Sequence, residues 1–133
     1  MESQPVKACL DTHTVLWSLA DDPRLGAQAR SLISHSRRSD LIISDIVLLE
    51  ISYLSAKGRI EDVDGVDVLL AKVAERFRVI PISPEIARLA LELDLPHGDP
   101  FDRVITATAK THAIPLLTRD RSITDSGSVA TLW

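Results

Sequence analysis

Four acidic side chains lie far apart in the sequence, at positions where folding could gather them: Asp11, Glu50, Asp102 and Asp120. Carboxylates held close together repel one another and raise each other's pKa, which destabilises a fold unless a cation neutralises them. An all-oxygen cluster suits a hard divalent ion, Mg²⁺ or Mn²⁺. Such an ion serves phosphodiester hydrolysis by lowering the pKa of the attacking water and offsetting phosphoryl charge, and a second ion would also stabilise the leaving oxygen.

Two of these acids follow predicted strands. Asp11 comes directly after the apolar residues 8–10, and Asp120 comes two residues after the apolar segment 115–118. Ligands of open α/β sheets bind at the carboxyl ends of the strands, so both carboxylates are expected at that edge. Each has a structural alternative, because Asp is also a good helix N-cap and a common turn residue. Their joint occurrence favours a shared site.

Glu50 is the only charged residue between Asp45 and Lys57, in a predicted helix that is apolar nearly all round. We therefore expect this helix to be largely buried. A buried carboxylate needs a partner, a metal or a proton. The alternatives are that Glu50 lies on a solvated strip or pairs with an arginine such as Arg59.

Asp99 and Asp102 both fall at the start of one predicted helix. With Pro100 at the first helical position, Asp99 takes the N-cap and Asp102 the third helical residue. Asp102 shares one face with Ile105 and Ala109, so we assign the chemistry to Asp102 and the capping to Asp99. The helix dipole alone would also explain Asp102, and the relative roles of the two acids stay open.

Apolar periodicity predicts strands that alternate with helices. Strands are predicted over 6–10, 41–44, 78–82, 115–118 and 129–133, and helices over 12–20, 25–34, 45–56, 66–77, from Ser83-Pro84 to before Pro96, and 99–112. This alternation implies an α/β fold with a mostly parallel central sheet and right-handed crossovers.

Composition limits the class of protein. The 133 residues, 45% hydrophobic and 26% charged, predict one globular domain over 1–133. The net charge of −4 means that nucleic acid must be held locally, and the 4% of aromatic residues disfavours binding led by base stacking. The single cysteine, Cys9, excludes an intramolecular disulfide framework and a thiolate-rich zinc site. No apolar run approaches the ~20 residues that span a bilayer, so we expect a cytoplasmic protein.

Four sequence blocks carry the acids in order. They are Leu10-Asp11-Thr12-His13-Thr14-Val15-Leu16-Trp17, Ser44-Asp45-Ile46-Val47-Leu48-Leu49-Glu50-Ile51, His97-Gly98-Asp99-Pro100-Phe101-Asp102-Arg103, and Leu116-Leu117-Thr118-Arg119-Asp120. Together they resemble the PIN-domain ribonucleases, and within them the VapC-type toxins of toxin-antitoxin pairs. The resemblance extends over nearly the whole chain.

The resemblance implies a PIN-like three-layer α/β/α sandwich that cleaves RNA with Mg²⁺ or Mn²⁺. It assigns catalysis and metal binding to Asp11, Glu50, Asp102 and Asp120. It also implies a homodimer and a cognate antitoxin that inhibits by covering the site. Leu49, Tyr53 and Leu54 either supply dimer contacts or are buried within the monomer.

Other side chains are candidates for supporting roles. The hydroxyls of Ser44 and Thr118 are placed to orient ligands or waters. Arg103, Arg119 and Arg121 lie near the inferred site and are candidates to hold the substrate backbone, with surface solubility as the alternative for each.

The histidines and the first tryptophan receive no functional assignment. His13, His35, His97 and His112 show no paired ligand spacing. Trp17 is expected to pack against the core.

Three alternatives compete with a nuclease. A phosphoacceptor regulatory domain would need an acid ending the third strand, where Ile82 instead runs into Ser83-Pro84. An aspartyl-nucleophile phosphatase would need Asp-x-Asp after the first strand, where the chain has Asp11-Thr12-His13. The third alternative is a catalytically silent RNA- or partner-binding module, against which the complete set of four acids counts.

Overall fold

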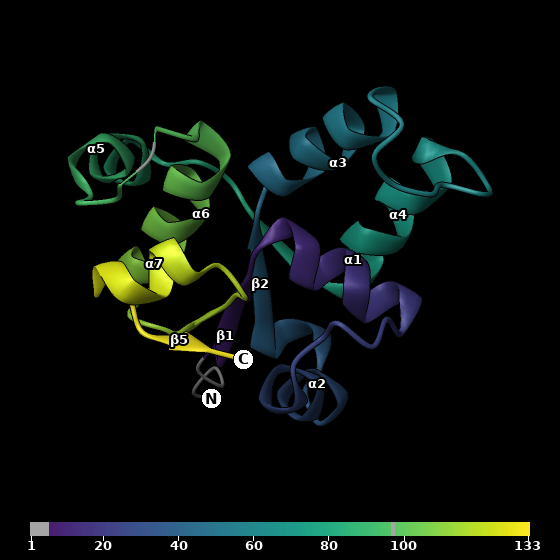
Figure 1. Ribbon diagram of the computed structural model, residues 1–133, viewed down its shortest axis with the longest axis horizontal. Coiled ribbons are helices and arrows are strands. Elements are labelled where there is room, and N and C mark those ends of the chain that lie inside the picture. Colours follow the sequence, from purple (N-terminus) through teal and green to yellow (C-terminus); the bar gives the residue numbers. More distant parts are fainter. Residues whose placement is uncertain (1–5, 97) are drawn as a thin grey trace.

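The computed structural model describes residues 6–96 and 98–133, and its centre is a five-stranded sheet (Figure 1). The strands are β1 (Ala8–Leu10), β2 (Leu41–Ser44), β3 (Arg78–Ile80), β4 (Leu116–Leu117) and β5 (Thr131–Leu132). Their order is β3-β2-β1-β4-β5, and every neighbouring pair is parallel. The predicted parallel sheet is confirmed.

Helices lie on both sides of this sheet. They are α1 (Thr12–Ala20), α2 (Ala27–Ser34), α3 (Ile46–Ala56), α4 (Val66–Arg76), α5 (Pro84–Glu92), α6 (Pro100–Thr111) and α7 (Arg121–Ser126), with a 3₁₀ turn at Arg38–Asp40. Figure 1 shows α5, α6 and α7 on one side of the strands and α1, α2 and α4 on the other. The expected three-layer α/β/α sandwich is therefore confirmed.

The strand order reverses at β1. The chain moves outward from β1 to β2 and β3, then returns to place β4 against the other edge of β1, with Leu10 paired to Leu117. Such a reversal opens a crevice at the carboxyl ends of the two strands that flank it. Asp11 directly follows β1 and Asp120 lies three residues after β4, so the topology brings both acids to this crevice.

The core is aliphatic, as the composition predicted. Every residue of β1, β2 and β4 is buried, which is the pattern of strands covered on both faces. Phe77 is the largest of the fully buried side chains in the described part of the chain. Helix α6 contacts both β1 and β2, so the helix that carries Asp102 is fixed directly on the centre of the sheet.

Two predicted helix starts are confirmed by their caps. The Ser83 hydroxyl accepts a hydrogen bond of 3.1 Å from the Ile86 backbone N–H. A carboxylate oxygen of Asp99 accepts one of 2.9 Å from the Phe101 backbone N–H. In both helices a proline follows the cap at the first helical position, where its missing N–H costs nothing.

The expectation that the helix around Glu50 is largely buried is wrong. On α3, Leu49 is 61% exposed and Tyr53 48% exposed, whereas Val47, Ile51 and Leu54 are buried. An apolar pattern on every face of a helix does not show how many of those faces pack against other elements. In this fold α3 contacts α1, α4, α6 and β2, while the part of its surface that carries Leu49 and Tyr53 stays exposed.

Other differences from prediction concern short elements. Helix α7 was not predicted, because its six polar-rich residues carry little apolar periodicity. Strand β3 ends at Ile80 rather than at residue 82, since Pro81 has no N–H to continue the ladder. The described residues form no helix that is long and apolar enough to cross a membrane.

Candidate active site

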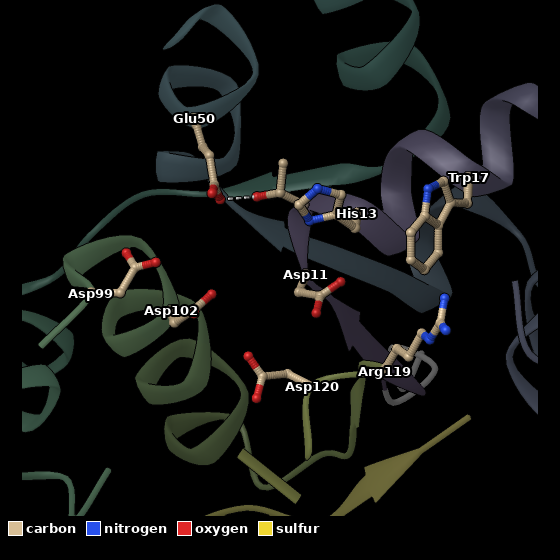
Figure 2. Close-up of a pocket in the computed structure, with 9 residues that line it drawn as sticks. Asp11, His13, Trp17, Glu50, Asp99, Asp102, Arg119 and Asp120 are labelled. Carbon is tan, nitrogen blue, oxygen red and sulfur yellow. Dashed lines mark hydrogen bonds between the residues drawn. The ribbon is translucent and has the colours of Figure 1, made fainter. Parts of the chain in front are cut away.

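A cavity of about 420 Å³ opens at the carboxyl ends of β1 and β4 (Figure 2). Its lining residues are Asp11, Thr12, His13, Trp17, Glu50, Asp99, Asp102, Arg119 and Asp120. The structure thus brings together all four of the predicted acids, from the ends of two strands and from two helices. Asp99 joins them, so five carboxylates face one space.

Asp11 is held by hydroxyl and backbone donors. Its Oδ1 accepts hydrogen bonds from the backbone N–H (3.0 Å) and the hydroxyl (2.6 Å) of Thr14, and its Oδ2 accepts one from the Thr118 hydroxyl (2.5 Å). Asp11 is therefore the N-cap of α1 and a lining residue of the cavity at once. Burial raises the pKa of Asp11, and the hydrogen bonds from Thr118 and Thr14 act in the opposite direction.

Glu50 reaches the cavity from α3 and accepts a hydrogen bond from the Thr12 hydroxyl (Figure 2). Burial raises the pKa of Glu50, and the negative charges of Asp99 and Asp11 add to this rise. The alternative pairing with Arg59 is not formed, and no ion pair to Lys or Arg holds Glu50 within the part of the chain that is described.

Asp102 shows most clearly that the cluster is electrostatically crowded. Burial raises its pKa to about 7, and the charges of Asp99, Asp120, Glu50 and Asp11 contribute in that order. Repulsion of this kind requires the carboxylates to be near neighbours in space. The crowding expected from the sequence is therefore present at this end of the sheet.

Asp99 and Asp120 also cap helices. Asp99 caps α6, as predicted, and still lines the cavity. Asp120 caps α7, where its Oδ1 accepts a hydrogen bond of 3.1 Å from the Ile123 backbone N–H. For both residues the structural and the functional interpretation are compatible, because a cap occupies only part of a carboxylate's acceptor capacity.

The chemistry of this donor set fits a hard divalent cation, since it consists of carboxylates whose repulsion such an ion would relieve. In residues 6–96 and 98–133 no group of three or more His, Cys, Asp and Glu side chains is already arranged to hold a metal ion. The hydroxyls of Thr12, Thr14 and Thr118 engage the oxygens of Asp11 and Glu50 instead. For three of these acids to ligate one ion, their side chains would have to come closer together than they are here.

Of the two predicted hydroxyl groups, only that of Thr118 touches the acids. It donates to Asp11 and accepts a hydrogen bond of 3.0 Å from the Asp120 backbone N–H, so it links the ends of β1 and β4. Ser44 is fully buried and accepts a bond of 3.2 Å from the Ile46 backbone N–H. It lies outside the lining of the cavity and caps the turn into α3.

Of the three candidate arginines, only Arg119 lines the cavity. The Arg103 guanidinium donates to the carbonyls of residues 90, 93 and 95 at 2.9–3.1 Å, which ties the end of α5 to α6. The expectation that Arg103 holds substrate is corrected accordingly, because its donors are used inside the fold and it does not line the cavity. Arg119 does line the cavity, and its guanidinium lies over the Trp17 ring at 5.8 Å from the centroid. Arg121 is exposed outside the lining.

Two lining residues, His13 and Trp17, were missed by sequence reasoning. His13 is exposed between the buried residues Thr12 and Thr14, and its ring centroid lies 5.6 Å from that of Trp17. The available signal was their i, i+4 spacing directly after Asp11, which places both rings on one face of α1 beside the predicted site. Thr14 had a similar signal, since a hydroxyl three residues after an N-cap Asp lies close to its carboxylate.

Comparison with known proteins places the chain in a family. Residues 8–127 match the PIN domain family. Ribonuclease VapC22 of Mycobacterium tuberculosis is 35% identical to this chain over 115 residues, which is 86% of this chain and 87% of that protein. The chain therefore belongs to the PIN-domain family, among its VapC-type members.

Solved structures agree with this fold. The DNA-bound VapBC structure from Salmonella typhimurium superposes with a TM-score of 0.73 at 18% identity, covering 96% of this chain and 97% of that one. A toxin-antitoxin complex from Klebsiella pneumoniae gives a TM-score of 0.65 at 22% identity, covering 96% and 97%. At these identities the likeness shows a shared fold.

Proposed function

We propose that this chain is a metal-dependent endoribonuclease that hydrolyses RNA phosphodiester bonds and acts as the toxin of a toxin-antitoxin pair. The observation that carries the proposal is the single cavity into which Asp11, Glu50, Asp102 and Asp120 project from four separate segments. The name of the M. tuberculosis relative supports the ribonuclease activity, and the Klebsiella complex supports an antitoxin partner.

In this proposal Asp11, Glu50 and Asp102 hold Mg²⁺ or Mn²⁺, and Asp120 assists through water or a second ion. When bound, the ion would lower the pKa of the attacking water and offset the negative charge on the phosphoryl oxygens. Thr118 and Thr14 fix the orientation of the Asp11 carboxylate, and Thr12 positions Glu50. Burial raises the pKa of Asp102 to about 7, so this carboxyl partly retains a proton at neutral pH, which a bound ion would displace.

The chain has a net charge of −4, so basic side chains near the cavity are needed to hold the RNA backbone. Arg119 is the one basic Lys or Arg side chain among the described residues that line the cavity, and it takes the role of holding a substrate phosphate. Because it is exposed and rests on the Trp17 ring, its guanidinium keeps donors available to the solvent side.

The partners and location follow from the same assignment. Residues 1–133 act as one PIN-like nuclease domain in the cytoplasm, where RNA is available and the buried Cys9 stays reduced. The exposed Leu49 and Tyr53 on α3, with Phe101 beside Tyr53 at 6.2 Å between ring centroids, provide an apolar surface for a homodimer. The antitoxin inhibits by covering the acidic cavity.

The test is RNA cleavage by the purified chain, free of antitoxin. Total RNA is incubated with Mg²⁺, Mn²⁺ or EDTA, and the new ends are mapped for the wild type and for Asp11→Asn. We expect discrete cuts that need the metal and that fall at least about 100-fold in rate in the variant, as removal of one catalytic stabilising group does in other enzymes. Asp125→Asn, an exposed residue outside the cavity, is the matched control and should cut as the wild type does. Equal cutting in EDTA, or by Asp11→Asn, would refute the proposal.

A further inference from the structure

We propose that His13, braced by Trp17, forms a stacking subsite for one RNA base next to the scissile phosphate. This inference rests on the proposed ribonuclease function and adds a substrate contact to it. It also revises the expectation from composition, since one of the five Phe, Trp and Tyr residues, Trp17, lies at the site together with a histidine ring.

The first support is position. Helix α1 starts at the residue after Asp11, so His13 and Trp17 present one ring per turn beside the acids, and Figure 2 shows both rings on the same side of the cavity. They are the aromatic residues in the described lining of this cavity. A phosphate held at the acids therefore has its neighbouring nucleotide within reach of the His13 ring.

The second support is the difference between the two rings. Trp17 is half-buried and fixed: the Trp133 ring meets it edge-on at 5.8 Å, and the Arg24 and Arg119 guanidinium groups lie over it at 4.9 and 5.8 Å from the centroid. His13 contacts Trp17 at 5.6 Å, yet its side chain is exposed. The two ring planes are tilted by 49°, so the fixed Trp17 ring restricts the His13 ring from one side and leaves its exposed part available to a planar group.

The third support is charge. Base stacking tolerates an acidic surrounding because it requires no contact with the phosphate, and Arg119 stands beside the rings to offset the adjacent phosphate. A second cavity of about 670 Å³ continues past the same two rings, and its lining carries the acids Asp22, Glu61, Asp62 and Asp64 together with the bases Arg24, Arg59 and Lys72. Asp22 pairs with Arg24 and Asp64 with Lys72, so this cavity offers no concentration of positive charge for further phosphates, and we assign one base to the subsite.

The experiment uses Trp17 as the reporter. The chain has two tryptophans, so Trp133→Phe leaves Trp17 as the single tryptophan, and Asp11→Asn in the same chain slows cleavage at least about 100-fold. Binding of a base-bearing RNA pentamer in Mg²⁺ is followed by Trp17 fluorescence and compared with an abasic ribose-phosphate pentamer. We expect quenching by the base-bearing pentamer only.

Substitutions at His13 then separate stacking from other effects. His13→Ala should weaken binding of the base-bearing pentamer about 5- to 100-fold, the range of one lost stacking contact, and leave the abasic pentamer unchanged. His13→Phe keeps a planar ring and should restore binding to within a few-fold. His35→Ala is the matched control, an exposed histidine at the end of α2 that lines neither cavity, and should change nothing.

The possible results distinguish the stacking subsite from the proposed ribonuclease function. With Asp11 intact, His13→Ala should raise KM for RNA cleavage about tenfold or more while kcat stays within a few-fold, since a contact equally strong in ground and transition state is lost. Metal-dependent cleavage with an unchanged KM in His13→Ala, or equal quenching by the abasic pentamer, would overturn the stacking subsite and leave the nuclease assignment standing. Quenching that depends on His13 in a chain that cuts no RNA would overturn the nuclease assignment alone.

Discussion

Several acids at the site have two roles that sequence reasoning treats as alternatives. Asp11, Asp99 and Asp120 each cap a helix with a carboxylate oxygen and also line the acidic cavity. For Asp11 and Asp120 the two positions coincide because the carboxyl end of a parallel strand is also where the next helix starts, whereas Asp99 follows helix α5. The structure confirms the predicted cap at Asp99 and the meeting of Asp11 and Asp120 at one edge of the sheet, and substitutions must separate capping from the proposed chemistry.

Substitutions at Asp11 make that separation in the metal-free protein. Asn keeps a side-chain oxygen for the Thr14 backbone N–H and removes a crowded charge, so Asp11→Asn should unfold at an equal or slightly higher temperature than the wild type. Asp11→Ala loses the cap as well and should cost about 0.5–2 kcal/mol of unfolding free energy. Thermal melts in EDTA measure the unfolding temperature, and denaturant melts in EDTA measure the unfolding free energy. A large loss of stability in Asp11→Asn would show that its charge stabilises the fold.

The raised pKa of Asp102 predicts that the stability of the fold decreases as the pH rises. Its pKa is about 7 in the folded chain, against the ordinary value of 3.8. Between these values the folded state binds more protons than the unfolded state, so the contribution of Asp102 to stability is fully present at low pH and is lost as the pH rises to about 7. The slope is at most about 1.4 kcal/mol per pH unit and smaller here, since Asp102 is partly solvent-exposed.

This contribution is measured by melting the metal-free wild type and Asp102→Asn between pH 5.5 and 8. The wild type should lose stability relative to the variant up to about pH 7, after which the difference should stay constant. Parallel curves over the whole range would contradict the raised pKa of Asp102.

For the helices, correct and incorrect predictions have different physical causes. The starts of α5 and α6 were predicted because cap and proline are local signals that the neighbouring residues satisfy by themselves. The burial of α3 was wrong because it depends on which helices pack against it, which no local pattern states. Helix α7 was missed because six residues are too few for a periodicity to appear.

The start of α2 lies against Trp133, and a substitution can test this contact between distant segments. A Cβ on Gly26, the N-cap of α2, would lie 2.6 Å from the backbone carbonyl carbon of Trp133. Gly26→Ala should therefore force α2 and the segment after β5 apart and destabilise the fold by about 1–3 kcal/mol. Gly98→Ala, where a Cβ meets nothing within 4 Å and φ is not positive, is the control in the same denaturant melt. Equal stability of the two variants would contradict the close contact.

For the molecule as a whole, the strand order decides which residues meet. The alternating pattern predicted a parallel sheet, and the position of Asp11 and Asp120 after strands predicted a shared edge. The order β3-β2-β1-β4-β5 itself was not predictable from local pattern, because it depends on which strands pair across distant segments. For the same reason the sequence did not predict that the Thr12 hydroxyl holds Glu50 of a distant helix, whereas the Thr118 hydroxyl, which donates to Asp11, was among its candidates. His13 and Trp17 had a local signal in their i, i+4 spacing, which the prediction from sequence did not use.

The central claim is that acids from four segments act as one divalent-cation site. Mn²⁺ binding followed by electron paramagnetic resonance tests it directly, with free Mn²⁺ counted in titrations of the wild type, Asp11→Asn, Glu50→Gln, Asp102→Asn and the exposed control Asp125→Asn. We expect each cavity substitution to weaken Mn²⁺ binding at least about tenfold, while the control binds as the wild type does. Wild-type affinity in all three cavity variants would contradict it.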